Sequence, residues 1–204
     1  MTITNGYATL AEFKSWVQVR GSSTSTDAGD DAVIETIIEA VSREIDKFCR
    51  RHFYAASTTR YYQAESASML FPDDIATATA LTIYTDDDGD GTYENTWASA
   101  DYNLEPANQI GGHPFTMIER MINGNFAFPV GVPRGVKITA SFGWSAIPTD
   151  IKMACLAIAH NVWMERSGQA SNGKVSVTAG GVVIRPESIP DHVSQNLLTY
   201  RRLV

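Results

Sequence analysis

The sequence predicts an α+β fold: a small helical bundle around a buried central helix, with an antiparallel β insertion. Three observations predict it. Apolar residues recur at the helical period near both ends of the chain, short alternating segments fill the middle, and the segment after residue 148 is apolar on nearly every side. Helices that flank a run of strands are typical of α+β proteins. We expect one domain over residues 1–204, with a helical frame at 7–55 and 146–204 and a β insertion at about 59–144.

Two helices are expected before the strands. Thr9 and Glu12 form a Ser/Thr-x-x-Glu capping box, which predicts a short helix running to about Val19. A Gly- and Ser-rich loop follows, and a long helix opens at Asp30, where acidic residues suit the positive end of a helix dipole. The apolar stripe of this helix consists of Val33, Ile34, Ile37, Ile38, Val41, Ile45 and Phe48.

Short strands are expected at residues 60–64, 80–85, 92–97, 116–121 and 136–142. The second and third of them flank an Asp- and Gly-rich stretch, which predicts a hairpin. Pro and Gly residues between the fourth and fifth strands mark a loop.

The central helix is expected to begin at Pro148, because proline is tolerated in a first helical turn. Its predicted core positions are Ile151, Cys155, Ile158 and Val162, which we expect to pack on Ile37, Val41 and Ile45 of the long helix. A second hairpin is expected at residues 174–178 and 181–184, followed by a last short helix from Pro190.

The composition excludes several function classes. The net charge of -7 and the pI of about 5.0 are unsuited to gripping DNA, so we expect no sequence-specific nucleic-acid binding. Neither a signal peptide nor a membrane span is recognisable, and we expect the protein to be made in the cytoplasm. Cys49 and Cys155 lie in apolar helical patterns and are expected as core residues.

No enzyme motif is found in the sequence. It has no Gly-x-Ser-x-Gly elbow, no P-loop, no His-Glu-x-x-His and no dinucleotide fingerprint after a strand. We therefore expect no catalytic residues and no cofactor, and we do not expect an enzyme.

The acidic loop at residues 86–91 admits two interpretations. Asp86, Asp88 and Asp90, followed by Gly91, match the opening of an EF-hand calcium loop. Trp97, however, stands where the bidentate Glu is expected, and the flanking segments are predicted strands rather than helices. We favour a polar hairpin turn, in which Asp and Gly tolerate positive φ, over a calcium site.

The order and spacing of four pieces of the chain resemble the head–tail connector, or adaptor, proteins of tailed bacteriophages. The pieces are residues 10–16 with 30–40, 45–53 with 59–62, 136–144 with 147–152, and 189–202. The predicted β insertion is longer than in the smallest members of that family, which are mostly helical.

The resemblance implies a structural subunit of a homo-oligomeric ring, expected to be twelvefold, in the virion neck between head and tail. Such a subunit would dock on the portal protein, bind a head-closure (stopper) or tail protein on its far side, and leave a central passage for DNA. A calcium-binding β recognition module of a virion is the alternative, and a hydrolase with a scattered site is a third, weaker possibility.

The C-terminal arm from Pro190 carries the predicted partner-binding residues. Leu197, Tyr200 and Leu203 are expected to be apolar anchors, and Arg201 and Arg202 are expected to meet acidic groups on the portal or on a neighbouring subunit. Because the apolar stripe of this arm is narrow, we expect it to become ordered on a partner and to be dispensable for folding.

Overall fold

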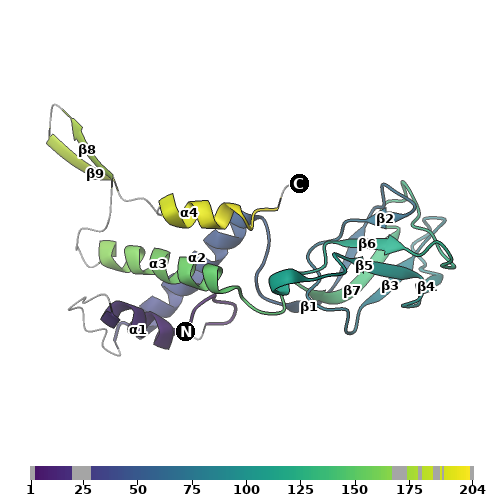
Figure 1. Ribbon diagram of the computed structural model, residues 1–204, viewed down its shortest axis with the longest axis horizontal. Coiled ribbons are helices and arrows are strands. Elements are labelled where there is room, and N and C mark those ends of the chain that lie inside the picture. The colour runs from purple at the N-terminus through teal and green to yellow at the C-terminus, as the bar shows by residue number, and fades with distance from the viewer. Residues whose placement is uncertain are drawn as a thin grey trace. The chain divides into compact units, whose positions relative to one another are not determined.

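The computed structural model describes residues 3–19, 29–166, 174–178, 181–185, 189 and 191–202. The chain divides into two compact units. The first, the helical unit, combines residues 1–51 with 147–204, and the second, the β unit, comprises residues 52–146. Figure 1 labels the elements of both.

The described residues of the helical unit form four helices. They are α1 (Leu10–Val19), α2 (Asp31–Cys49), α3 (Thr149–Arg166) and α4 (Asp191–Leu198). Between α3 and α4, β8 (Lys174–Thr178) and β9 (Gly181–Arg185) pair as an antiparallel hairpin, which confirms the second predicted hairpin. The capping box at the start of α1 is also confirmed. The amide of Glu12 donates to the Thr9 hydroxyl at 3.2 Å, and the Thr9 amide donates to the Glu12 carboxylate at 2.8 Å.

The contact between α2 and α3 forms the core of the helical unit. Ile151, Cys155 and Ile158 are fully buried on α3, as predicted, and the Cys155 sulfur lies 3.6 Å from the Ser42 hydroxyl of α2. Val162 is only half-buried. The buried stripe of α2 consists of Ile34, Ile38, Val41, Ile45 and Cys49, and the predicted contact residue Ile37 is half-buried at its edge.

A polar network fixes the segment before α1 to α2, and the sequence patterns do not predict it. The Tyr7 amide donates to the Ser42 hydroxyl at 2.9 Å, and the Tyr7 hydroxyl donates to the carboxylate of Asp46. Arg43 pairs with Asp46 at 3.2 Å and donates to the carbonyl of Asn5 at 2.8 Å. Tyr7 and Ser42 are completely buried, so these hydrogen bonds satisfy polar groups that would otherwise be costly to desolvate.

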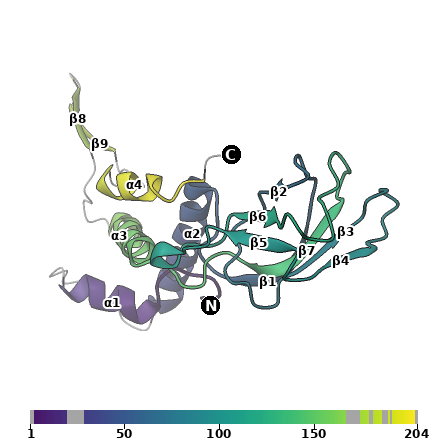
Figure 2. The ribbon, with the colours of Figure 1, turned by 45° about the vertical axis from the view of Figure 1, so that its right-hand side comes forward.

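The β unit contains two antiparallel sheets. The four-stranded sheet has the order β1-β7-β3-β4, and the three-stranded sheet has the order β2-β6-β5. Figure 2 shows β3 and β4 running side by side to the loop that joins them. The strands are β1 (Ala56–Tyr62), β2 (Met69–Leu70), β3 (Thr82–Thr85), β4 (Asn95–Trp97), β5 (Tyr102–Glu105), β6 (Met117–Arg120) and β7 (Val136–Phe142), with a short 3-10 helix at Ile110–Gly112.

Both sheets contribute side chains to one core. Along β7 every second residue is buried, from Val136 to Phe142, as expected for a strand with one face on the core. Trp97 of β4 stacks on Phe128 at a centroid distance of 4.5 Å, and Ile118 of β6 is fully buried in the same cluster. The β unit therefore has a hydrophobic core of its own.

The predicted fold class is wrong in its main feature. The chain does combine helices and antiparallel strands, but it is not a small helical bundle carrying an insertion. The described part of residues 52–146 holds seven strands in two sheets around a separate core. The physical reason is that alternate residues of β7 and its partner strands point into the core. The apolar surface that they bury holds both sheets together without a helical bundle packed over them.

The chain enters and leaves the β unit at neighbouring points. β1 pairs with β7 along its whole length, from Ala56 opposite Phe142 to Tyr62 opposite Val136. Just outside this ladder, the rings of Phe53 and Trp144 lie 5.4 Å apart. Gly143 has a φ of 114°, and a Cβ there would overlap the carbonyl oxygen of Tyr54. Only glycine, which has no Cβ, fits at this close approach of the chain to the backbone of Tyr54.

The first prediction tests the helical core. Ile158→Ala should lower the free energy of unfolding by about 2–5 kcal/mol, because it leaves a cavity at a fully buried position. Chemical denaturation followed by the helical circular-dichroism signal measures this loss. Met153→Ala on the same helix is the control, since its side chain is 44% exposed and its loss should be small. Equal losses for the two variants would show that α3 is not the centre of the unit.

The second prediction tests the crossing at Gly143. Gly143→Ala should destabilise the β unit by about 4 kcal/mol or more, since it combines a left-handed backbone with a backbone clash. Gly131→Ala is the matched control: Gly131 has a φ of 79° with open space around it, so only the backbone strain of about 1–2 kcal/mol applies. Hydrogen exchange of the β1 and β7 amides reports both effects. A Gly143 variant no worse than the Gly131 variant would refute the close approach.

Candidate functional site

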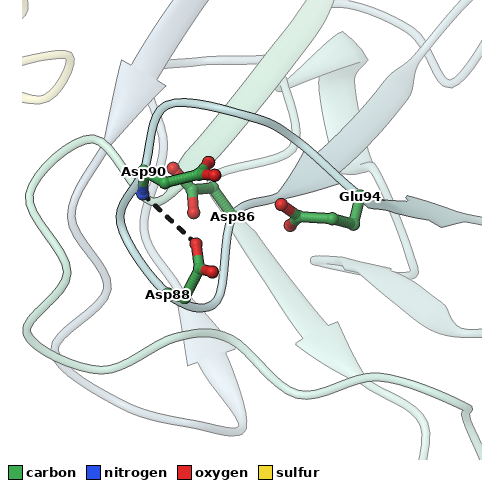
Figure 3. A group of neighbouring side chains, drawn as sticks. All are labelled: Asp86, Asp88, Asp90 and Glu94. Carbon is green, nitrogen blue, oxygen red and sulfur yellow. Dashed lines mark hydrogen bonds between the residues drawn. The ribbon is translucent and has the colours of Figure 1, made fainter.

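The loop between β3 and β4 gathers the acidic side chains that the sequence singles out. Carboxylate oxygens of Asp86, Asp88, Asp90 and Glu94 lie within 4.8 Å of one another, and Figure 3 shows the four side chains around the same loop. Within the described residues, this is the one group of three or more His, Cys, Asp or Glu side chains close enough to share a metal ion. The hairpin prediction is confirmed by the pairing of Ile83 with Trp97.

Asp86 acts as the internal cap of this loop. It is 3% exposed, and its two carboxylate oxygens accept hydrogen bonds from the amides of Gly89 at 2.7 Å and Gly91 at 2.9 Å. Gly89 and Gly91 both have positive φ, which places their amides toward the carboxylate. Burial alone would raise the pKa of Asp86, but the amides of Gly91 and Gly89 stabilise the charged form and hold the pKa below its usual value.

The outer carboxylates make local hydrogen bonds of the same kind. Asp88 accepts from the amide of Asp90 at 3.2 Å, and Asp90 accepts from the amide of Thr92 at 2.7 Å. These bonds are those of successive Asx turns, in which each carboxylate replaces a missing backbone acceptor. They give the Asp residues of the loop a structural role in its turns.

Sequence reasoning missed Glu94. The likeness to an EF-hand loop rests on the first three acidic positions and breaks down at the last position, where Trp97 stands. Glu94 falls at the ninth position counted from Asp86, where EF-hand loops often hold a further ligand. The spacing therefore contained the signal. Asp101 was also missed: it is 2% exposed and accepts from the amides of Ala98 and Asn125.

The predicted partner-binding residues occupy different environments. Leu197 is 1% exposed inside the helical unit, where its carbonyl accepts a hydrogen bond from the Cys49 thiol. Tyr200 is half-buried, and its hydroxyl donates to Asp150 at 3.2 Å; burial, and then the nearby Asp150, raise the pKa of Tyr200. Arg201 is exposed.

Arg202 ties the end of the arm to α2, because its amide donates to the Cys49 carbonyl at 2.9 Å. Leu203 lies outside the described residues. Leu197 and Val193 belong to the core of the helical unit, so a deletion from Pro190 would remove two buried side chains. That the five predicted residues bind a partner stays a prediction.

Comparison with known proteins identifies the fold. No protein-family model and no curated protein matches the chain. A chain in the neck of an empty gene transfer agent particle, computed with C6 symmetry, is 19% identical with a TM-score of 0.54, over 100% of this chain and 94% of that chain. A chain in the virion of the native particle is 18% identical with a TM-score of 0.57, over 96% of this chain and 89% of that one.

A chain in the neck of the native particle, computed with C12 symmetry, is 18% identical with a TM-score of 0.53, over 96% of this chain and 88% of that one. The chain shares its fold with these particle proteins. The likeness includes both units, since it extends over nearly the whole length. No helix in the described part of the chain is long and apolar enough to cross a membrane.

The third prediction concerns the acidic loop. We expect a hairpin turn that is independent of metal, so the double variant Asp88→Asn and Asp90→Asn should melt at nearly the parent temperature, with or without calcium. Asp86 is left unchanged because it caps the loop. Glu65→Gln, which removes an exposed carboxylate elsewhere in the β unit, is the control.

A calcium-dependent rise in the melting temperature of the parent, lost in the double variant but kept in the control, would contradict this prediction. A site loaded to 100 times its Kd would add about 2.7 kcal/mol, an effect easily seen in a melting curve.

Proposed function

We propose that this chain is a structural subunit of the neck of a tailed-phage-like particle, forming the head–tail connector ring. The shared fold carries this proposal: it covers 96–100% of this chain in structures described as necks or the virion of a gene transfer agent particle. Near-complete coverage supports a role for the whole chain rather than for one borrowed unit. We further propose that the helical and β units act together as a single connector subunit.

The neck structures of the relatives were computed with C6 and C12 symmetry, which supports a ring. We propose a twelvefold ring that docks on the portal vertex and joins it to a head-closure or tail protein. Rings arise when two different surfaces of each copy meet head to tail and the rotation closes. The role calls for contact surfaces and makes no demand for a catalytic centre.

The charge of the chain suits a passage for DNA better than a binding site for it. A net charge of -7 gives a subunit that repels phosphate on average, and a ring multiplies that charge. A duplex that must slide through the centre during packaging and ejection needs a wall that does not hold it. We propose that DNA passes through this ring without sequence-specific contacts.

The C-terminal arm is the proposed docking element. Tyr200, Arg201 and Arg202 lie at the surface beyond α4, with Leu203 following them in the sequence. Leu197 has a supporting role in this proposal, because its burial fixes α4 and so positions the residues that follow. The proposed binding partner of this arm is the portal or a neighbouring subunit.

The fourth prediction tests the ring. The purified chain, mixed with portal assemblies of its own particle, should form closed rings visible by electron microscopy and by light scattering, and a chelator should not disperse them. The chain without portal is the control for spontaneous assembly. A chain that stays monomeric with portal and responds to calcium instead would reject the connector role in favour of the recognition module.

A further inference from the structure

The outward face of the three-stranded sheet combines methionine with acidic and amide side chains. Ile118 of β6 lies opposite Leu70 of β2 and Leu104 of β5, and these three side chains point to the core or pack against it. The alternate residues on the same strands therefore turn away from the core. Among them are Met69 and Met117.

We define the methionine face as Met69 and Met117 on the strands together with the residues just after β2 and β6, namely Phe71, Met121 and Ile122. Phe71 is 65% exposed and Ile122 is 91% exposed, while Met69 and Met121 are 37% and 38% exposed. The face holds three of the six methionines of the chain. β2, β6 and β5, which support it, form one layer in Figures 1 and 2.

Exposure of these apolar side chains to water is unfavourable in free energy. Contiguous exposed apolar side chains on a soluble chain mark a contact surface, whereas single ones need no explanation. Methionine is well suited to such a surface, because its flexible thioether side chain adapts to the shape of a partner. Phe71 and Ile122 would supply the larger areas to be buried.

The charges on this face select the partner. Glu119 stands in the row between Met69 and Asn103, and Glu105 stands opposite Met117. The described residues of these rows include no Lys or Arg. A face on which methionines alternate with carboxylates fits a segment that is both apolar and basic.

The chain carries such a segment at its C-terminus. Residues 198–202, here the C-terminal basic segment, contain Leu198, which is 45% exposed, and the exposed Arg201. The segment is held in place by the hydrogen bonds from the Arg202 amide to Cys49 and from Tyr200 to Asp150. A segment fixed in advance loses little entropy when it binds.

We propose that the methionine face of one subunit binds the C-terminal basic segment of the next copy in the ring. The proposal rests on the ring function above and names the contact that would build it. The two surfaces differ, so their pairing is head to tail, as a closed ring requires. Arg201 meets Glu119 in this contact, and Leu198 packs on Phe71.

The fifth prediction is a charge swap. Arg201→Glu and Glu119→Arg should each weaken self-association at least about tenfold, because each places like charges together at the contact. Combining both changes in one chain should restore association. Arg166→Glu, an exposed cation at the end of α3, is the control and should assemble as the parent does. Light scattering of the ring fraction measures association, and circular dichroism verifies that every variant is folded.

A second pair of variants tests the apolar part. Phe71→Ser combined with Ile122→Ser should also reduce ring formation at least about tenfold through lost apolar burial. Met153→Ser removes an exposed apolar side chain elsewhere and should leave assembly unchanged.

The outcomes separate this contact from the ring itself. Parent rings together with unaffected variants would overturn the contact and leave the connector role standing. Variants that form rings but no longer join portal or tail would overturn it as well, and would assign the face to another virion protein. A parent chain that never forms rings would overturn both proposals. Loss in the single charge variants with recovery in the swap supports the contact.

Discussion

The antiparallel pairing of β1 with β7 is the contact on which the architecture depends. It joins the first and last strands of the β unit over seven residue pairs, so the chain leaves that unit beside the point where it entered. β7 also pairs with β3, and Ile75 bridges to Phe142, so the remaining strands are assembled on this ladder. Since about a hundred residues separate α2 from α3 in the sequence, their packing against each other needs such an adjacent exit. Gly143 lies at the closest approach of the two chain segments, where a side chain would overlap the backbone of Tyr54.

Much of the fold was predictable wherever one periodicity persisted over several turns or residues. The stripe of α2 and the alternation of β7 each reflect one buried face, and that physical cause is local. β2 was missed because two residues are too few to establish a period, and β5, whose sequence is Tyr-Asn-Leu-Glu, was missed as well. The predicted fold class was wrong because the β unit is held together by two sheets that share one core. That packing joins segments far apart in the sequence, so a local pattern does not predict it. The network of Tyr7 with Asp46 is invisible for the same reason, since 39 residues separate the partners.

The candidate sites also differ in how much of each could be predicted from the sequence. The acidic loop was located correctly because Asp and Gly in close succession have few structural uses other than a turn or a cation site. The amides of Gly89 and Gly91 point to Asp86 as in a turn, a detail that only the backbone conformation gives. In the arm, a helix of eight residues presents a stripe too narrow to show whether Leu197 faces its own chain or a partner. The methionine face was not predicted because its residues belong to two separate strands and the segments after them, which come together only through strand pairing.

The two cysteines of the helical unit are fully buried. Burial raises the pKa of Cys49 to about 12 and that of Cys155 to about 11, so both thiols stay protonated at neutral pH. Oxidation and disulfide exchange act on the thiolate, and the two sulfurs remain free of a disulfide bond. Burial and protonation together slow the oxidation of both thiols. This chemical inertness makes the helical core durable in oxidising surroundings.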